Sequence, residues 1–431
     1  MNLRRISVAA PPALLWLGAA LAACSSSPGA PDAGLEASSG TSPGTAGAPS
    51  VAGSNALPAG SGSLADGGSG GGGNSAGAGG SQVGIAGVGP GGVGGAGLPS
   101  TAGSPSGGAA STDPGPEGDG KRTLAKPFTA SPDVSAQNGV PHGARLKFVM
   151  LKGSTERYSD ANDREINVYV PSQYVKGTPA SVLVVQDGNQ FFGWVDLVSN
   201  TLDNLIGQNK LPPIVAVFVN NGGGDAQGSH RGQEYDTLSG VYAEFVDREV
   251  LPRVEQETSS KLPDQAVTFS KDPEARGTLG GSSGGIASFI AAWYHPDLFR
   301  RVIGFSPSFV AQESPKNPDH PLGAWNFHED GHEDDGGIIA KTDPLKPIRV
   351  WMEAGTNDNG AGTQNDPNTP YPYYDFAYAI PRAFDKMLEK SYPHVHLDVG
   401  TGAGHVDGGM VRATLPDALL WTWRGSPGWP G

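Results

Sequence analysis

Five largely apolar runs in the second part of the chain restrict the folds that are open to it. They are Ala180–Gln186, Pro213–Val219, Arg301–Phe305, Pro347–Met352 and His394–Val399. A strand with one face in water alternates apolar and polar residues, whereas a strand buried on both faces reads as a continuous apolar run. The runs therefore predict a mainly parallel central sheet that is covered on both faces.

Helical patterns lie between these runs. Apolar residues recur at three- and four-residue spacing, or occupy nearly every position, in Gly240–Glu255, Gly285–Tyr294, Tyr374–Lys390 and Leu415–Trp423. Strands that alternate with helices indicate an α/β fold with right-handed crossovers. We also expect an opening antiparallel pair of strands at Lys147–Leu151 and Glu165–Val170.

Composition divides the 431 residues into three parts. Residues 1–23 carry Arg4 and Arg5 before an apolar run, which is typical of a signal peptide. Residues 24–120 are rich in Gly, Ser, Ala and Pro, and have no aromatic residue, Lys or Arg after Cys24. Such a segment cannot bury enough apolar surface to fold, so we expect a disordered linker. We expect residues 121–431 to form the folded domain.

Cys24 is the only cysteine and follows Leu21-Ala22-Ala23, which resembles a bacterial lipobox. The resemblance implies cleavage before Cys24 and acylation of that residue, which anchors the chain to a membrane. Ser25 in the next position implies the outer membrane or cell surface in a Gram-negative cell. Ordinary secretion is the alternative. The formal net charge of −14 argues against a nucleic-acid partner.

Two serines lie among glycines in the stretch Gly280–Gly285, directly before a predicted helix. The pattern G-x-S-x-G places a serine on a sharp turn between a strand and a helix, where its hydroxyl is exposed as a nucleophile. Here the pattern fits around both Ser282 and Ser283. The absence of a Lys after the glycines excludes a phosphate-binding P-loop.

An acid and a histidine follow two later apolar runs. Asp358 comes after Pro347–Met352, and His405 comes after His394–Val399. Since polar residues at the carboxyl ends of parallel strands meet at one edge of the sheet, we expect the serine, acid and histidine to converge. Their order along the chain is that of α/β-hydrolase triads. A serine hydroxyl needs a base, and the imidazole needs a carboxylate that orients it.

Other residues compete for two of these roles. Glu353 lies within or at the end of a predicted strand, whereas Asp358 lies in the loop beyond it, so Asp358 is the expected acid. His394 and His396 share one face of a strand and His295 ends a helix, which leaves His405 as the expected base.

From about residue 139 onward, the chain resembles the enterochelin esterase-like, or "putative esterase", family of α/β-hydrolases, whose relatives include feruloyl esterases and mycolyltransferases. The resemblance lies in the order and spacing of several short segments. In chain order they are Gly139–Gly143 and residues 168–174, 184–188, 204–219, 231–235, 272–289, 295–309, 347–358, 402–405 and 415–424.

The resemblance implies that Ser282 is the nucleophile, because one variable residue and two glycines follow it. It places the backbone N–H groups of Ser283 and of Gly188 or Asn189 in the oxyanion hole. Possible pocket residues are Gln190 and Trp194, while Arg231 and Glu234 either line the pocket or form an ion pair that holds a loop. The 310–346 segment is expected to shape the pocket as well.

The expected function is hydrolysis of a carboxylic ester. The ester is expected to be a small molecule or to be linked to a carbohydrate. It is expected to be an ester of a sugar, of a hydroxy acid or of an aromatic acid. The alternatives are an acyltransferase with the same fold and a tethered binding protein that is catalytically silent. The family implies no cofactor and no metal. The acidic stretch Phe327–Asp335 therefore predicts a solvated loop rather than a metal site.

Overall fold

The computed structural model describes residues 113–225, 228–310, 312–315, 323–327, 335–358 and 375–431. The expected signal peptide, Cys24 and residues 24–112 lie outside these ranges. Within the part of the chain that the structure describes, no helix combines the length and hydrophobicity needed to cross a bilayer.

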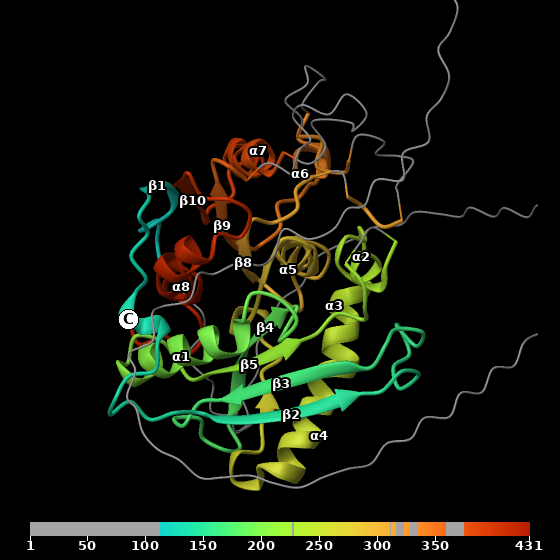
Figure 1. The fold of residues 1–431 in the computed structure, drawn as a ribbon, viewed down its shortest axis with the longest axis vertical. Helices are drawn as coiled ribbons and strands as arrows, with labels where there is room; N and C mark the ends of the chain where they lie inside the picture. Colours follow the sequence, from blue (N-terminus) through green and yellow to red (C-terminus); the bar gives the residue numbers. More distant parts are fainter. Residues whose placement is uncertain (1–112, 226–227, 311, 316–322, 328–334, 359–374) are drawn as a thin grey trace, which may run out of the picture. The chain divides into compact units, whose positions relative to one another are not determined.

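The fold is built on one ten-stranded sheet (Figure 1). The strands are β1 (Gly120–Ala125), β2 (Ala144–Met150), β3 (Arg164–Val170), β4 (Pro179–Gln186), β5 (Ile214–Val219), β6 (Thr268–Phe269), β7 (Arg276–Gly281), β8 (Arg301–Phe305), β9 (Arg349–Gly355) and β10 (Val395–Thr401). Their order across the sheet is β1-β10-β9-β8-β7-β4-β5-β3-β2, and the short β6 pairs with β4. The pairs β2–β3 and β3–β5 are antiparallel, and the other pairs are parallel.

Helices cover both faces of this sheet. They are α1 (Trp194–Gly207), α2 (His230–Tyr235), α3 (Val241–Phe245), α4 (Leu251–Lys261), α5 (Ser283–Tyr294), α6 (Gly337–Lys341), α7 (Phe376–Glu389) and α8 (Gly408–Trp423). A turn of π-helix, Val246–Val250, joins α3 to α4. This mostly parallel sheet with helices on both faces is the architecture of the α/β-hydrolase fold that the sequence predicts.

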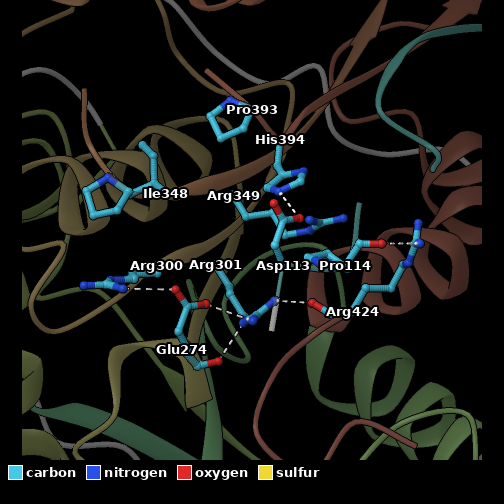
Figure 2. Close-up of a pocket in the computed structure, with 11 residues that line it drawn as sticks. Asp113, Pro114, Glu274, Arg300, Arg301, Ile348, Arg349, Pro393, His394 and Arg424 are labelled. Atoms are coloured by element: carbon cyan, nitrogen blue, oxygen red, sulfur yellow. Dashed lines mark hydrogen bonds and ion pairs between the residues drawn. The ribbon is translucent and has the colours of Figure 1, made fainter. Parts of the chain in front are cut away.

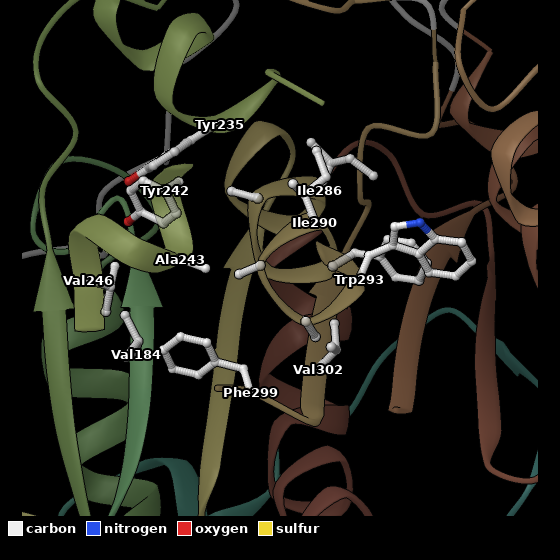
Figure 3. Close-up of a cluster of buried hydrophobic side chains, with 14 of the residues drawn as sticks. Val184, Tyr235, Tyr242, Ala243, Val246, Ile286, Ile290, Trp293, Phe299 and Val302 are labelled. Carbon is white, nitrogen blue, oxygen red and sulfur yellow. The ribbon is translucent and has the colours of Figure 1, made fainter. Parts of the chain in front are cut away.

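The central strands bury both of their faces, which explains their continuous apolar runs. In β4, Val182 and Val184 belong to a core with α3, α4, α5 and α7. Figure 3 shows Val184 together with residues of α3 and α5 from this core. Leu183 and Val185 belong to a second core with α1 and α8. Successive side chains of a strand point to opposite faces, so a strand between two helical layers needs an apolar residue at every position.

The domain begins earlier than the sequence predicts. Residues 113–120, assigned to the linker, pack against the domain: Asp119 accepts a hydrogen bond from Trp421 Nε1 at 3.1 Å and contacts His394 Nδ1 at 3.0 Å. The strand β1 then adds to the sheet edge by pairing Gly120 with His396. Residues 113–120 thus lie on the linker side of the expected boundary although they pack against the domain, because they resemble the expected linker in being polar or rich in Gly and Pro.

Candidate active site

The turn between β7 and α5 holds Ser282 in an unusual backbone conformation. Its φ is 59° and its ψ is −127°, a region that residues with a side chain rarely occupy. Its N–H donates to Phe305 O on β8 at 2.9 Å, which ties the turn to the neighbouring strand. Such strain persists only where the surrounding structure imposes it, and it is common at nucleophilic serines on strand-to-helix turns.

Steric contacts explain why glycines flank Ser282. A Cβ on Gly280 would lie 2.9 Å from the nitrogen of Gly285 and closer still to the carbonyl of Gly284. A Cβ on Gly284 would lie 2.9 Å from Oδ2 of Asp187. The tight turn therefore requires glycine at both flanking positions of the pattern centred on Ser282.

The hydroxyl of the neighbouring Ser283 points into the protein. Ser283 is 1% exposed, and its Oγ accepts a hydrogen bond from Gln312 Nε2 at 2.7 Å. The same Nε2 also donates to Oδ1 of the buried Asp236 carboxyl at 3.3 Å. Burial raises the pKa of Asp236 to about 7, although the charge of Arg231 and this hydrogen bond oppose the rise. Ser282, in contrast, is partly exposed.

Asp358 and His405 are in direct contact. Oδ1 of Asp358 lies 2.7 Å from Nδ1 of His405, and the side chains are 1% and 39% exposed respectively. Asp358 follows β9 and His405 follows β10, two neighbouring parallel strands. The edge of the Phe376 ring packs against the imidazole, with 4.5 Å between the ring centroids. With Nδ1–H donated to the carboxylate, Nε2 of His405 is free to act as a base.

The loop that carries His405 lies beside the turn that carries Ser282. The N–H of Val406 donates to Ser306 Oγ at 2.9 Å, and a Cβ on Gly281 would lie 3.2 Å from the Val406 side chain. No hydrogen bond joins the Ser282 hydroxyl to the His405 ring among the residues that the structure describes. Such bonds are often long before substrate binds.

The competing acid and histidines have other partners. Glu353 is 2% exposed and accepts from Thr414 Oγ1 at 2.7 Å, and burial raises its pKa well above the usual range. His394 contacts Asp119, and His396 stacks on Trp351 with centroids 3.8 Å apart. Each of these three side chains is therefore held by a partner other than the serine turn.

The expected oxyanion donors differ in availability. Ser283 is the first residue of α5, where backbone N–H groups have no partner within the helix. The N–H of Asn189 already donates to Asn220 Oδ1 at 2.8 Å. Gly188 has a positive φ of 32°, and a Cβ there would collide with the Asn220 side chain. Gly188 is therefore the better candidate for the second donor, because the N–H of Asn189 already donates to another residue.

Two of the four expected pocket residues form buried ion pairs. Arg231 binds Asp187 through Nε at 2.9 Å and Nη2 at 2.8 Å. Glu234 binds Arg164 at 2.6 and 2.8 Å. The pair suggested between Arg231 and Glu234 is therefore wrong, because each side chain pairs with a residue from another part of the chain. Both pairs hold the loops that follow β4 and β5.

Of the other two expected pocket residues, one is buried in the core and one lies at the surface. Trp194 is fully buried and stacks on Phe305, with centroids 5.5 Å apart, so it is a core residue and not part of a pocket wall. Gln190 is exposed, and its Oε1 accepts from the N–H of Asn221 at 2.7 Å. In the predicted 310–346 segment, residues 311, 316–322 and 328–334 lie outside the described ranges.

Sequence reasoning assigned no role to four buried or half-buried polar residues near this site. Asp187, Asn221, Asp236 and Gln312 all lie close to the serine turn or to the loop after β4. Only Asp187 carried a signal, since it follows an apolar run directly. Asp335, at the end of the acidic stretch, binds Asn326 and Lys341.

Comparisons with known proteins identify the family. Residues 159–384, a little over half of the chain, match the family model described as "putative esterase". One curated protein, the uncharacterized protein YbbA of Bacillus subtilis (strain 168), is 24% identical over 178 residues, which span 37% of this chain and 62% of YbbA. The match thus covers less than two thirds of that relative.

Solved structures with similar folds include two esterases. The CE1 ferulic acid esterase of the anaerobic fungus Anaeromyces mucronatus is 16% identical with a TM-score of 0.49, covering 70% of this chain and 99% of that one. The enterochelin esterase of Shigella flexneri is 20% identical with a TM-score of 0.46, covering 69% and 62%. The family match over residues 159–384 confirms the resemblance read from the sequence: the chain belongs to the putative esterase family of α/β-hydrolases.

Proposed function

We propose that the chain is a serine carboxylic-ester hydrolase, with Ser282 as nucleophile, His405 as general base and Asp358 as the residue that orients the histidine. The observation that carries this proposal is the 2.7 Å contact between Asp358 Oδ1 and His405 Nδ1 across the ends of two adjacent strands. The strained, glycine-flanked turn at Ser282 supports it, as does the membership of an esterase family.

The reaction proceeds in two halves. Nε2 of His405 takes the proton from Ser282 as its Oγ attacks the ester carbonyl, and the developing oxyanion accepts hydrogen bonds from the N–H groups of Ser283 and Gly188. The proton then passes from His405 to the leaving alcohol, which gives an acyl-enzyme. In the second half, His405 activates a water that releases the acid. Asp358 remains ionised and stabilises the imidazolium.

Aromatic rings flank the reacting groups, which supports an aromatic or otherwise apolar acyl group. Phe192 is 41% exposed, and a Cβ on Gly281 would contact its ring at 3.2 Å. Phe376 packs against the imidazole of His405. Phe376 is buried, so Phe192 provides the exposed aromatic face, and such a face beside a polar reacting centre is typical of small-molecule sites. We therefore propose esters of aromatic acids as the first substrates to test.

The test compares three variants of the full chain on p-nitrophenyl acetate and on methyl esters of hydroxycinnamic acids. Ser282→Ala should reduce kcat/KM by at least about 10³-fold, and Asp358→Asn by about 10³- to 10⁴-fold. Ser283→Ala is the matched control and should keep most activity, since only its backbone N–H takes part. Loss of activity in Ser283→Ala alone would make the choice of serine wrong.

A second measurement separates hydrolysis from acyl transfer. Product analysis with and without a sugar acceptor should give the free acid in both cases. An acyl sugar as the main product would replace the hydrolase proposal with a transferase that uses the same residues.

We also propose that Cys24 is acylated and holds the protein at the bacterial cell envelope, on the basis of the lipobox-like Leu21–Cys24 sequence. Metabolic labelling with an alkynyl fatty acid should mark the wild-type chain and leave Cys24→Ala unlabelled. Equal labelling of both would exclude this cysteine as the acylated residue.

A further inference from the structure

A cavity of about 340 Å³ lies at the opposite edge of the sheet from Ser282, where β8 and β9 begin (Figure 2). We call it the arginine cavity. It is lined by Asp113, Pro114, Glu274, Arg300, Arg301, Pro347, Ile348, Arg349, Pro393, His394 and Arg424. Its position at the amino ends of the strands separates it from the candidate active site at their carboxyl ends.

Two of its arginines are neighbours in the sheet. Arg301 and Arg349 are register partners on the parallel strands β8 and β9, and they are 2% and 5% exposed. Like charges that face each other on adjacent strands destabilise a sheet. Burial lowers the pKa of Arg301 to about 10, and burial together with the charges of Arg301 and Arg424 lowers that of Arg349 to about 10. This edge therefore concentrates buried positive charge.

Capping of α8 explains part of this cluster. Arg301 Nη1 donates to the carbonyls of Thr422 and Arg424, and Arg349 Nε donates to the carbonyl of Trp421 at 2.8 Å. These carbonyls lie at the carboxyl end of α8, where positive charge is favourable. Arg301 also pairs with Glu274 at 2.9 Å, so its guanidinium is well supplied with partners.

Arg349 keeps two unused nitrogens. Its Nη1 and Nη2 are buried and donate to no acceptor among the described residues, although the guanidinium stacks on Trp421 with 4.0 Å to the ring centroid. Asp119 Oδ1 is 3.9 Å from Nη2, too long for a hydrogen bond, and this oxygen already accepts from Trp421 Nε1. Buried charged donors that make no hydrogen bond are costly, so their retention at a cavity points to a ligand.

The two acids that line the cavity, Glu274 and Asp113, pair with side chains other than Arg349. Glu274 binds Arg300 at 3.1 Å as well as Arg301, and Asp113 Oδ1 lies 3.2 Å from His394 Nε2. Asp113 is the accessible member, with its side chain 76% exposed. An incoming anion can therefore replace the Asp113 carboxylate beside His394 without breaking the buried pairs.

We propose that the arginine cavity binds a small oxyanion, a phosphate or carboxylate group whose oxygens accept hydrogen bonds from Nη1 and Nη2 of Arg349. The two nitrogens of one guanidinium edge match two oxygens of such a group, a bidentate arrangement that is stronger than a single hydrogen bond. The volume of the cavity leaves room for more than the anionic group alone.

The test is calorimetric titration of the full chain with inorganic phosphate and, separately, with citrate, at an ionic strength held constant with sodium chloride. Arg349→Gln should weaken saturable binding by at least tenfold. Arg248→Gln, which removes an arginine that is 61% exposed on another surface, is the matched control and should bind as the wild type does. Asp113→Asn should bind at least about threefold more tightly, because it removes the competing carboxylate.

Binding of only one anion identifies its chemistry as phosphate or carboxylate and supports the proposal in either case. Absence of saturable binding of both anions to the wild type contradicts it, and so does unchanged affinity in Arg349→Gln. Circular dichroism shows whether Arg349→Gln folds. If it does not, Asp113→Asn decides, and an affinity equal to that of the wild type overturns the proposal.

Discussion

Replacing Gly280 by Ala tests the structure of the serine turn most directly. The added methyl group would lie 2.9 Å from the Gly285 nitrogen and closer to the Gly284 carbonyl, well inside the 3.5–4.0 Å at which carbon atoms pack. The first turn of α5 must therefore withdraw by roughly 1 Å. Since Ser282 and Ser283 lie between Gly280 and Gly284, the nucleophile and its oxyanion donor move with it.

The size of the effect follows from two opposing terms. Overpacking a tight site costs about 1–3 kcal/mol, whereas Gly→Ala stabilises by about 0.4–1 kcal/mol through the unfolded state. We expect a net loss of about 1–2 kcal/mol in the free energy of unfolding. A displacement of roughly 1 Å at reacting groups lowers the rate by about 10²-fold, so activity should fall far more than stability does.

Urea unfolding and ester hydrolysis measure both quantities on the same preparation. The control is Gly408→Ala at the start of α8, where an added Cβ has nothing within 4 Å. This variant should remain within about 0.5 kcal/mol of the wild type and keep its activity. Wild-type activity and stability in Gly280→Ala would refute the steric account of the turn.

Three further outcomes follow from buried charges and from the domain boundary. Because burial raises the pKa of Asp236 to about 7, its folded form binds a proton that the unfolded chain has already lost. The free energy of unfolding should therefore fall by about 2 kcal/mol between pH 5 and 7. Asp236→Asn should remove this loss in urea titrations at the two pH values, and parallel pH profiles of the two proteins would contradict it. Arg231→Gln leaves the buried Asp187 carboxylate without its bidentate partner, so it should lower the free energy of unfolding by about 3–5 kcal/mol. A change of under about 1 kcal/mol would show that the fold does not depend on this ion pair. A chain that starts at residue 121 should have a free energy of unfolding about 2 kcal/mol lower than one that starts at 113, because it lacks the hydrogen bonds of Asp119. Equal free energies of unfolding would support the boundary predicted from composition.

The strands and helices that could be predicted are those whose burial leaves a pattern. The strands β4, β5, β8 and β9 contribute to both hydrophobic cores, so each shows an apolar run in the sequence. In β10 only alternate residues, Val395 and Leu397, belong to a core. The edge strand β1 has only exposed or half-buried residues, so it leaves no apolar run in the sequence. Helix α1 starts after Gly193, in a left-handed conformation without a side-chain cap, so the usual start signal was missing.

Some residues of the candidate site could be predicted from the sequence and others could not. Asp358 and His405 follow strands and could be chosen by position, whereas the choice of Ser282 over Ser283 also needed the family resemblance. The partners of the loop after β4 could not, because Arg231 reaches Asp187 from 44 residues away. Such pairings depend on how distant loops pack, and local sequence carries no record of them.

The pairing of β1 with β10 also decides how the domain responds to mechanical force. The two strands run parallel over the six pairs from Gly120–His396 to Ala125–Thr401. A pull on the chain ahead of Asp113, directed along the strand, loads the evenly spaced hydrogen bonds of a parallel pair together in shear. They resist collectively and cannot be peeled apart one by one. The load passes to β10, the strand that leads into His405.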